Sequence, residues 1–336
     1  MAETVLTLDD IEELAQNALL SAGASSENAA SVARSTRLAE RDGVRSHGLL
    51  YVPIYAEHVR CGKVDGQATP SVAQPRPGVV RIDAGSGFAH PAIDAGFDAF
   101  MAAARTNGVA VMNVYNSYNC GVLGHHAERI AEAGLLGLCT TNAPASIAPV
   151  GGRKAVIGTN PFAIAAPGGD SGATFVIDQS ASIIARSEIM LRARQGEQID
   201  PAWALDADGR PTADPAVALT GSMAPAGGPK GFGIGLMVEL LAACLSGAVL
   251  GKDASSFASP AGGPPNTGQC FIAFEPVACS GGAFNARVTA LVAAISEQEG
   301  ARLPGSRRRS ARTRILADGV RVDDALLAQI RALNAN

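Results

Sequence analysis

The imidazole side chain changes its protonation near neutral pH, so histidines are the first candidates for proton transfer in this sequence. There are five: His47, His58, His90, His125 and His126. His47 stands between Ser46 and Gly48 in an expected turn, where it can face a cleft, and we take it as the candidate catalytic residue, although lone histidines are more often structural. His58, in the helix after this turn, is expected at the surface or at a helix cap.

The adjacent pair His125 and His126 does not indicate a metal site. Two ligands on one helix face need the i, i+4 spacing, and neither an HExxH motif nor a cysteine cluster accompanies this pair. We therefore expect no bound metal.

Two further residues have types and positions suited to cofactor binding. Asp178 ends the apolar run FVID, where a carboxylate can orient a histidine, bind a ribose hydroxyl or cap a helix. Lys230 precedes an apolar helix expected from Gly231, so its ammonium and the helix amides can hold an anion, unless it is a solvated loop lysine. The chain lacks both GxGxxG after a strand and GxxxxGK[ST], which argues against a standard Rossmann or P-loop site.

The composition narrows the class of protein. The chain has 336 residues, 47% apolar and 17% charged, which is typical of a folded globular protein with two domains. The net charge is −4 and the single basic cluster is Arg307 to Arg309, so neither nucleic acid nor a membrane surface is expected as a partner. Six cysteines without CxxC pairing, an acidic first segment and no run of 18 apolar residues predict a cytoplasmic protein.

Helices are expected in the first part of the chain. Thr7 and Asp10 form a variant capping box ahead of an amphipathic helix. A second helical pattern covers residues 26–43, and a third, distorted by Pro53, follows the turn that contains His47.

Strands and helices alternate from residue 79 onward, which predicts an α/β fold. The expected strands are VVRIDA, VAVMNVYN, LLGLCTTN, KAVIGT, FAIAAP, TFVIDQ and FIAFEPV. Since several of them follow one another without long helices, we expect a mixed sheet. Residues 231–251 are almost entirely apolar and are expected to form a buried helix, packed in the core or against another subunit.

The last helical patterns resemble the N-terminal helices in character. We therefore expect residues 1–76 and 285–336 to form one helical domain from both termini. The α/β domain, residues 77–284, would be inserted into it.

Several motifs together resemble the malate/L-lactate dehydrogenase-like family, which includes sulfolactate, ureidoglycolate and diketogulonate oxidoreductases and the cyclic imino acid reductases. They are SHG from Ser46, GGRKAVIGTNPFAIAAP from Gly151, VIDQS from Val176, WALDADGRPTADP from Trp203, PKGFG from Pro229 and RLPG from Arg302. Their order and spacing cover nearly the whole chain. The resemblance implies a nicotinamide cofactor on a non-Rossmann fold and a homodimer.

The resemblance also implies residue roles. His47 would give the substrate oxygen or nitrogen its proton as hydride reaches the adjacent carbon, and Asp178 would be the acid near the nicotinamide. The residues expected at the cofactor are Phe175, Val176, Ile177, Asp178, Gln179, Ser180, Pro229, Lys230, Gly305, Ser306 and Arg307. Those expected at the substrate are Tyr51, Asn119, Thr159 and Asn160.

Two positions depart from the family pattern. Where the family usually offers an arginine shortly after SHG, this chain reads SHGLLYV and has Tyr51; where many members have a histidine in an SNHFG-like turn, SYNCG places Asn119. A bidentate clamp on a carboxylate cannot come from Tyr51. Either Arg45 or Arg153 replaces it, or the substrate is not a simple 2-oxo acid.

The leading hypothesis is an NAD(P)-dependent oxidoreductase that reduces a small 2-oxo acid, with His47 as proton donor. One alternative is a reductase of a cyclic imino acid, and another is a paralogue that binds the cofactor without turnover. Arg307 to Arg309 can pair with a 2′-phosphate, which favours NADP over NAD. The expected partners are a small-molecule substrate and a second copy of the chain.

Overall fold

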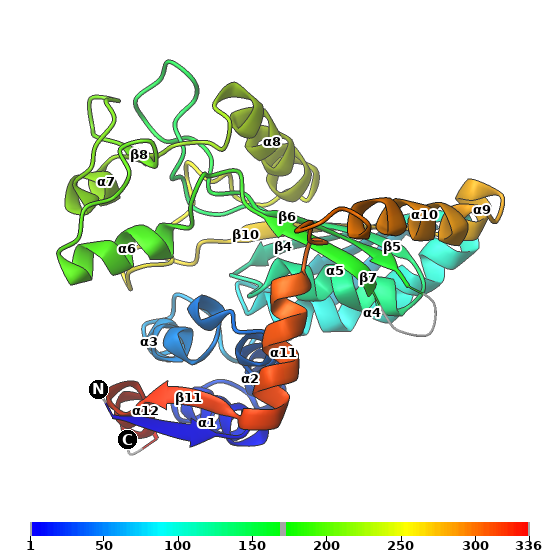
Figure 1. Ribbon diagram of the computed structural model, residues 1–336. Coiled ribbons are helices and arrows are strands. Elements are labelled where there is room, and N and C mark those ends of the chain that lie inside the picture. The colour runs from blue at the N-terminus through cyan, green and yellow to red at the C-terminus, as the bar shows by residue number, and fades with distance from the viewer. Residues whose placement is uncertain (1, 169–172, 335–336) are drawn as a thin grey trace.

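A seven-stranded sheet lies at the centre of the computed structural model, which describes residues 2–168 and 173–334 (Figure 1). In spatial order its strands are β2 (Ser71–Arg76), β3 (Val79–Asp83), β4 (Val109–Ser117), β10 (Thr267–Phe274), β5 (Leu136–Thr141), β6 (Phe162–Pro167) and β7 (Ala173–Gln179). The strands β3 and β4 run parallel, and the other neighbouring pairs are antiparallel. The prediction of an α/β protein with a mixed sheet is confirmed.

Helices cover both faces of this sheet. The helices α4 (Ala89–Asn107) and α5 (Leu123–Glu132) pack on one face, while α8 (Pro229–Glu239) and the π-helical turn after it, Leu240–Leu245, lie on the other (Figure 1). Gly96 allows α4 to approach closely, because a Cβ there would lie 2.5 Å from the Cδ1 atom of Ile82. The core beneath α4 and α5 is therefore tightly packed, and it fixes where each strand ends.

Both chain ends meet in a smaller unit beside the sheet (Figure 1). It contains β1 (Glu3–Leu6), α1 (Leu8–Ser21), α2 (Ser26–Arg41), α3 (Val52–Arg60), β11 (Val320–Asp323) and α12 (Asp324–Leu333). The capping box is confirmed: the Thr7 hydroxyl accepts from the Asp10 amide at 3.1 Å, and the Asp10 carboxylate accepts from the Thr7 amide at 2.8 Å. The strands β1 and β11 pair antiparallel, which ties the two ends together.

The helix α10 (Phe284–Ser296) differs from the sequence expectation. The prediction grouped residues 285–336 with the N-terminal helices, but α10 lies along the sheet next to α9 (Pro276–Ser280), away from α1 and α2 (Figure 1). The chain returns to the N-terminal helices through α11 (Ser306–Asp318). The apolar character of α10 was misleading, because none of its residues is buried within this chain.

Three local predictions also differ from the structure. KAVIGT forms no named strand, only a bridge between Ile147 and Ile157. No strand is expected before residue 79, yet residues 66–78 contain the exposed edge strand β2. The helix expected over residues 231–251 ends at Leu245, and within this chain it is buried on one side only, since Leu236, Leu240 and Leu245 are 44%, 55% and 57% exposed. Its packing against another subunit stays a prediction.

A third, smaller cluster of buried side chains lies above the sheet. It joins α6 (Arg186–Gln195), β8 (Ala204–Leu205), α7 (Pro215–Thr220) and β9 (Ser222–Met223) to the loop around Ile147 and Ile157. Ala226 donates its amide hydrogen to the Ala181 carbonyl at 2.8 Å. The segment that leads into α8 is therefore held against the turn that follows β7.

Candidate functional site

His47 lies in a sharply bent segment whose shape depends on Gly48 and Glu40. Two single turns of 3₁₀ helix, Arg45–His47 and Leu49–Tyr51, follow α2. The buried Glu40 carboxylate accepts from the Leu49 amide at 2.8 Å, and a Cβ at position 48 would lie 2.1 Å from the same oxygen. Glycine is thus required where the chain turns past Glu40.

One nitrogen of the His47 ring already has a neighbour. The Ser46 hydroxyl lies 3.0 Å from Nδ1 of His47, so Nε2 is the atom available for proton exchange. Burial lowers the pKa of His47, the charge of Asp178 raises it, and the charges of His125 and Arg308 lower it further. These four side chains come from four separate elements and form one electrostatic group.

Asp178 is fixed by two donors. Its Oδ2 atom accepts from Nη2 of Arg308 at 2.6 Å and from the Gly124 amide at 2.9 Å. A Cβ at position 124 would lie 2.6 Å from Oδ2 of Asp178 and 2.4 Å from Nη1 of Arg308, so any larger residue there would displace this ion pair. The end of β7, the first turn of α5 and the first turn of α11 are joined at this carboxylate.

The segments predicted to contact the cofactor converge on the edge strand β7, which carries Phe175 to Gln179 and leads into Ser180. A Cβ on Gly305 would lie 3.2 Å from the Val176 carbonyl, and Arg309 donates to the Thr174 carbonyl at 2.9 Å, so α11 begins against this strand. Pro229 and Lys230 open α8, just after the segment held to Ala181. These contacts bring the three segments to one edge of the sheet.

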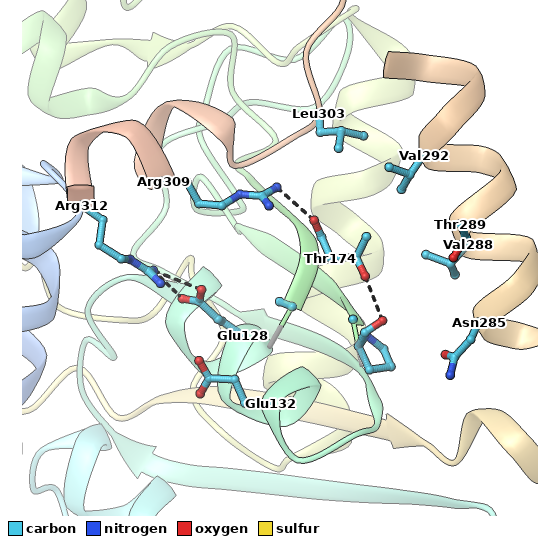
Figure 2. Close-up of a pocket in the computed structure, with 13 residues that line it drawn as sticks. Glu128, Glu132, Thr174, Asn285, Val288, Thr289, Val292, Leu303, Arg309 and Arg312 are labelled. Atoms are coloured by element: carbon cyan, nitrogen blue, oxygen red, sulfur yellow. Dashed lines mark hydrogen bonds and ion pairs between the residues drawn. The ribbon is translucent and has the colours of Figure 1, made fainter. Parts of the chain in front are cut away.

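A cavity of about 570 Å³ lies beside this edge, between α10, α11 and α5 (Figure 2). In Figure 2, Arg309 reaches Thr174, and Arg312 reaches Glu128, with Nη2 of Arg312 at 2.9 Å from Oε2 of Glu128. Glu132 lines the same cavity, and burial raises its pKa.

Tyr51 and Asn119, the two departures from the family pattern, are neighbours in the structure. Burial raises the pKa of Tyr51 to about 12, while the side chains of Tyr118 and Asn119 act on its hydroxyl in the opposite direction. Asn119 accepts from the Gly121 amide at 2.6 Å. Two neutral polar groups therefore occupy this side of the site.

Thr159 and Asn160 have structural partners. The Thr159 carbonyl accepts from the Ala181 amide at 2.8 Å. Asn160 is fully buried, and its amide nitrogen donates to Glu239 at 2.7 Å and to the Gly235 carbonyl at 2.9 Å. Because these contacts fasten β6 to α8, the predicted contact of Asn160 with substrate is not supported by this geometry.

The prediction that His58 lies at the surface or at a cap is wrong. His58 is fully buried, and its Nδ1 atom lies 2.5 Å from the Tyr118 hydroxyl. It faces inward because α3 packs with its Tyr55 side against Tyr118 and Phe88.

Three residues at the candidate site were not predicted from the sequence: Arg308, Gly124 and His125. Arg308 belongs to a basic run considered only for the cofactor, and His125 was considered only as a metal ligand. The signal that would have found Arg308 is its position in the first turn of the helix that follows RLPG.

Neither a metal-binding cluster nor a membrane-spanning helix is found among the described residues. Within residues 2–168 and 173–334, no three or more His, Cys, Asp or Glu side chains are grouped so that they could hold a metal ion. No helix in that part of the chain has the length and apolar content needed to cross a membrane.

Known proteins match this chain over almost its full length. A family model described as malate/L-lactate dehydrogenase matches residues 6–331. The chain is 40% identical over 331 residues to a delta(1)-pyrroline-2-carboxylate reductase of Ancylobacter novellus, covering 98% of this chain and 97% of that protein. It is 42% identical over 332 residues to a (2R)-3-sulfolactate dehydrogenase (NADP(+)) of Chromohalobacter salexigens, with the same coverage.

Solved structures agree. The delta1-piperideine-2-carboxylate reductase of Pseudomonas syringae matches with a TM-score of 0.92 and 34% identity, over 98% of this chain and 99% of that one. A sulfolactate dehydrogenase of Methanocaldococcus jannaschii matches with a TM-score of 0.88 and 29% identity, over 98% and 96% of the two chains.

Proposed function

This chain belongs to the malate/L-lactate dehydrogenase family, and from that premise we propose its function. It is an NAD(P)-dependent oxidoreductase that transfers a hydride between the nicotinamide cofactor and a small acid, a 2-oxo acid being reduced to its 2-hydroxy acid. The assignment rests on the arrangement of His47, Asp178 and Arg308, which lie far apart in the sequence. Arg308 bonds to Asp178, and the charges of both side chains act on His47.

The residues of this chain supply the proton and the positioning. When bound, the cofactor supplies the hydride. His47 gives its proton to the substrate oxygen or nitrogen, with Ser46 beside Nδ1 fixing the ring. Asp178 balances the positive charge of His47 before transfer.

The edge of β7 fits a nicotinamide dinucleotide. The first turn of α11, which begins at Ser306, suits a phosphate, since a helix N-terminus attracts anions; the Ser306 amide itself donates to the Leu303 carbonyl at 3.2 Å. Of the arginines 307–309, Arg308 pairs with Asp178 and Arg309 bonds to Thr174; Arg307 is exposed and makes no hydrogen bond or ion pair within the described residues. A free guanidinium at this place supports NADP, whose 2′-phosphate it can bind.

A cyclic imino acid is the second candidate substrate. It is favoured by the likeness to the pyrroline-2-carboxylate and piperideine-2-carboxylate reductases, and the same proton donor serves a C=N bond. The sulfolactate dehydrogenase relative favours a 2-oxo acid. Tyr51 and Asn119 are proposed to contact the substrate in both cases, as neutral hydrogen-bonding groups.

The test is a panel of 2-oxo acids and cyclic imino acids, each with NADH and NADPH, followed by loss of nicotinamide absorbance. Turnover of a 2-oxo acid supports the leading proposal, and turnover of an imino acid alone supports the second. Cofactor binding without turnover of any substrate on the panel would support the alternative that this chain is a paralogue that binds the cofactor without catalysis. His47→Ala should lower kcat by about 10²-fold or more while the cofactor still binds.

A homodimer in the cytoplasm is also proposed. The outward side of α8 and the following π-helical turn carries the exposed apolar side chains Leu236, Met237, Leu240 and Leu245, a face suited to a second copy of the chain. All six cysteines are free thiols, as suits a reducing compartment. Light scattering of wild type and Leu240→Glu tests the dimer: the variant should shift toward monomer.

A further inference from the structure

Glu40 is a buried acid in a place that does not favour a carboxylate. Its side chain lies in the last turn of α2 and is 4% exposed. Within the described residues no cation forms an ion pair with it: the Arg45 guanidinium, whose charge acts on it, donates instead to the Arg321 carbonyl at 3.1 Å. Burial raises the pKa of Glu40, and the bond from Leu49 and the charge of Arg45 offset only part of that rise.

The position of Glu40 in its helix adds to this cost. The C-terminal end of a helix carries a partial negative charge, which disfavours an acid there, and a buried acid without a cation is costly as well. The carboxylate therefore does not contribute to stability as an ion pair would. What it does provide is a hydrogen-bond acceptor for the backbone that follows α2.

That backbone is the segment that carries His47. Oε1 of Glu40 accepts from the Leu49 amide at 2.8 Å, two residues after His47. The Leu49 side chain is buried in the core of the unit that both chain ends form, so residue 49 is held through its amide and through its side chain. Between them, Gly48 passes so close that a Cβ would lie 2.1 Å from the same oxygen.

The hydrogen bonds within the two 3₁₀ turns do not fix the direction of one turn relative to the other. The Gly48 amide donates to the Arg45 carbonyl at 3.1 Å, and the Tyr51 amide donates to the Gly48 carbonyl at 2.9 Å. Each of these bonds closes a single turn. The bond from Leu49 to Glu40 ties the junction of the two turns to α2.

Glu40 acts on this segment through contact and not through charge. After burial, which lowers the pKa of His47, the charges that act on this pKa are those of Asp178, His125 and Arg308. Glu40 does not belong to this group of charges. Its link to His47 is the short stretch of backbone that it holds.

We propose that Glu40 is a positioning residue for the proton donor: its carboxylate holds the junction at Gly48 and Leu49 so that the His47 ring is presented to the substrate. The inference rests on the proposed function. A general acid has to lie within hydrogen-bond reach of the atom that takes its proton, and a misplacement of about 1 Å can lower the rate about 10²-fold. Glu40 itself exchanges no proton in the reaction.

The first experiment compares Glu40→Met with Glu40→Gln. Methionine keeps the length of the side chain but leaves the Leu49 amide without a comparable acceptor, whereas the amide oxygen of glutamine still accepts. Glu40→Met should lower kcat of reduction about tenfold or more, with KM for the cofactor unchanged. Glu40→Gln should keep the wild-type kcat and the wild-type pH profile, because the role needs an acceptor and not a charge.

Two outcomes would overturn the inference: a wild-type kcat in Glu40→Met, or an equal loss of kcat in Glu40→Met and Glu40→Gln. If Glu40→Met does not fold, Glu40→Ala replaces it, since alanine also removes the acceptor and places no new group against Gly48. The same fall in kcat is expected for Glu40→Ala.

Thr36→Ala is the matched control for a loss of stability alone. Thr36 is also buried on α2, one turn before Glu40, and its hydroxyl donates to the Val32 carbonyl of the same helix at 3.1 Å. Thr36→Ala should lower the free energy of unfolding in urea without lowering kcat. A fall in kcat equal to that of Glu40→Met would show that α2 acts on the rate through stability only, and would contradict the inference.

A second measurement does not depend on turnover. The Ser46 hydroxyl lies 3.0 Å from Nδ1 of His47, so the ring ¹⁵N chemical shifts of His47, identified by their loss in His47→Ala, report this geometry. They should move in Glu40→Met and stay in place in Glu40→Gln and Thr36→Ala. If wild type reduces nothing on the panel, the proposed function fails; unchanged His47 shifts in Glu40→Met would show separately that Glu40 does not position the ring.

Discussion

The carboxylate of Asp178 and the guanidinium of Arg308 form an ion pair of 2.6 Å that joins the end of β7 to the first turn of α11 across 130 residues of sequence. The two groups act on His47 in opposite directions: Asp178 raises its pKa and Arg308 lowers it. The pair therefore holds α11 against this edge of the sheet and also sets the charge around His47, the proposed proton donor.

Opposite pH shifts are expected when either partner is neutralised. In the proposed mechanism reduction requires protonated His47, so the rate of reduction is expected to fall as pH rises through the pKa of His47. Arg308→Met removes a positive charge, raises that pKa and moves the falling limb of kcat to higher pH. Asp178→Asn removes a negative charge and moves it to lower pH. The kcat profile of each variant is the measurement, and shifts of the same sign in both would contradict the arrangement.

Arg307 is expected to select the cofactor. Of the three arginines at positions 307–309, Arg307 is the one whose side chain has no ion pair among the described residues. Its replacement by alanine should raise KM for NADPH about tenfold, as for loss of one charge-assisted hydrogen bond. KM for NADH should stay unchanged. Arg302→Ala, another exposed arginine in the same connection, is the control. Equal effects on both cofactors in Arg307→Ala would remove the case for a 2′-phosphate contact.

Asn160 is expected to act on stability. It is fully buried, its amide bonds to Glu239 and Gly235, and its φ of 40° lies in the left-handed region. Asn160→Ala leaves the Glu239 carboxylate short of a donor and strains the backbone, which should cost about 2–4 kcal/mol in urea unfolding. Asn160→Gly loses the same hydrogen bonds but adopts the left-handed backbone conformation without strain. It should therefore destabilise the protein less than Asn160→Ala does.

Local sequence signals predicted the elements that position the site. The capping box of Thr7 and the SHG turn depend on neighbouring residues, and both are where the sequence placed them. The strand that carries Asp178 next to its last residue was likewise predicted from its apolar run. Such features are decided within a few residues, so a single sequence contains them.

Long-range packing could not be predicted in the same way. The inward position of His58 depends on Tyr118, 60 residues away, and the fixing of Asp178 depends on Arg308. The exposed strand β2 forms only because β3 offers it a partner. The apolar helix α10 was wrongly grouped with the N-terminal helices. An apolar pattern indicates that a helix face packs against other residues, but it does not indicate which residues those are.

Asp42 is expected to make the fold sensitive to acid. Burial alone would raise its pKa, but hydrogen bonds from His125, Arg312 and Arg41 outweigh burial and lower the pKa well below the usual range. The native carboxylate thus stays charged where the unfolded one, with a pKa of about 3.9, takes up a proton. Its contribution to stability is complete above that value and is lost as pH falls below it.

At neutral pH, Asp42→Asn should lower the free energy of unfolding by about 3–5 kcal/mol, as for breaking a buried ion pair. The difference from wild type should shrink as the buffer is taken below about pH 4. Asp9→Asn is the matched control, since Asp9 pairs with Arg37 but is 89% exposed, and its stability should stay within about 0.5 kcal/mol of wild type at neutral pH. Urea unfolding at a series of pH values measures both, and a constant difference between Asp42→Asn and wild type would show that the carboxylate is not ionised in the native state.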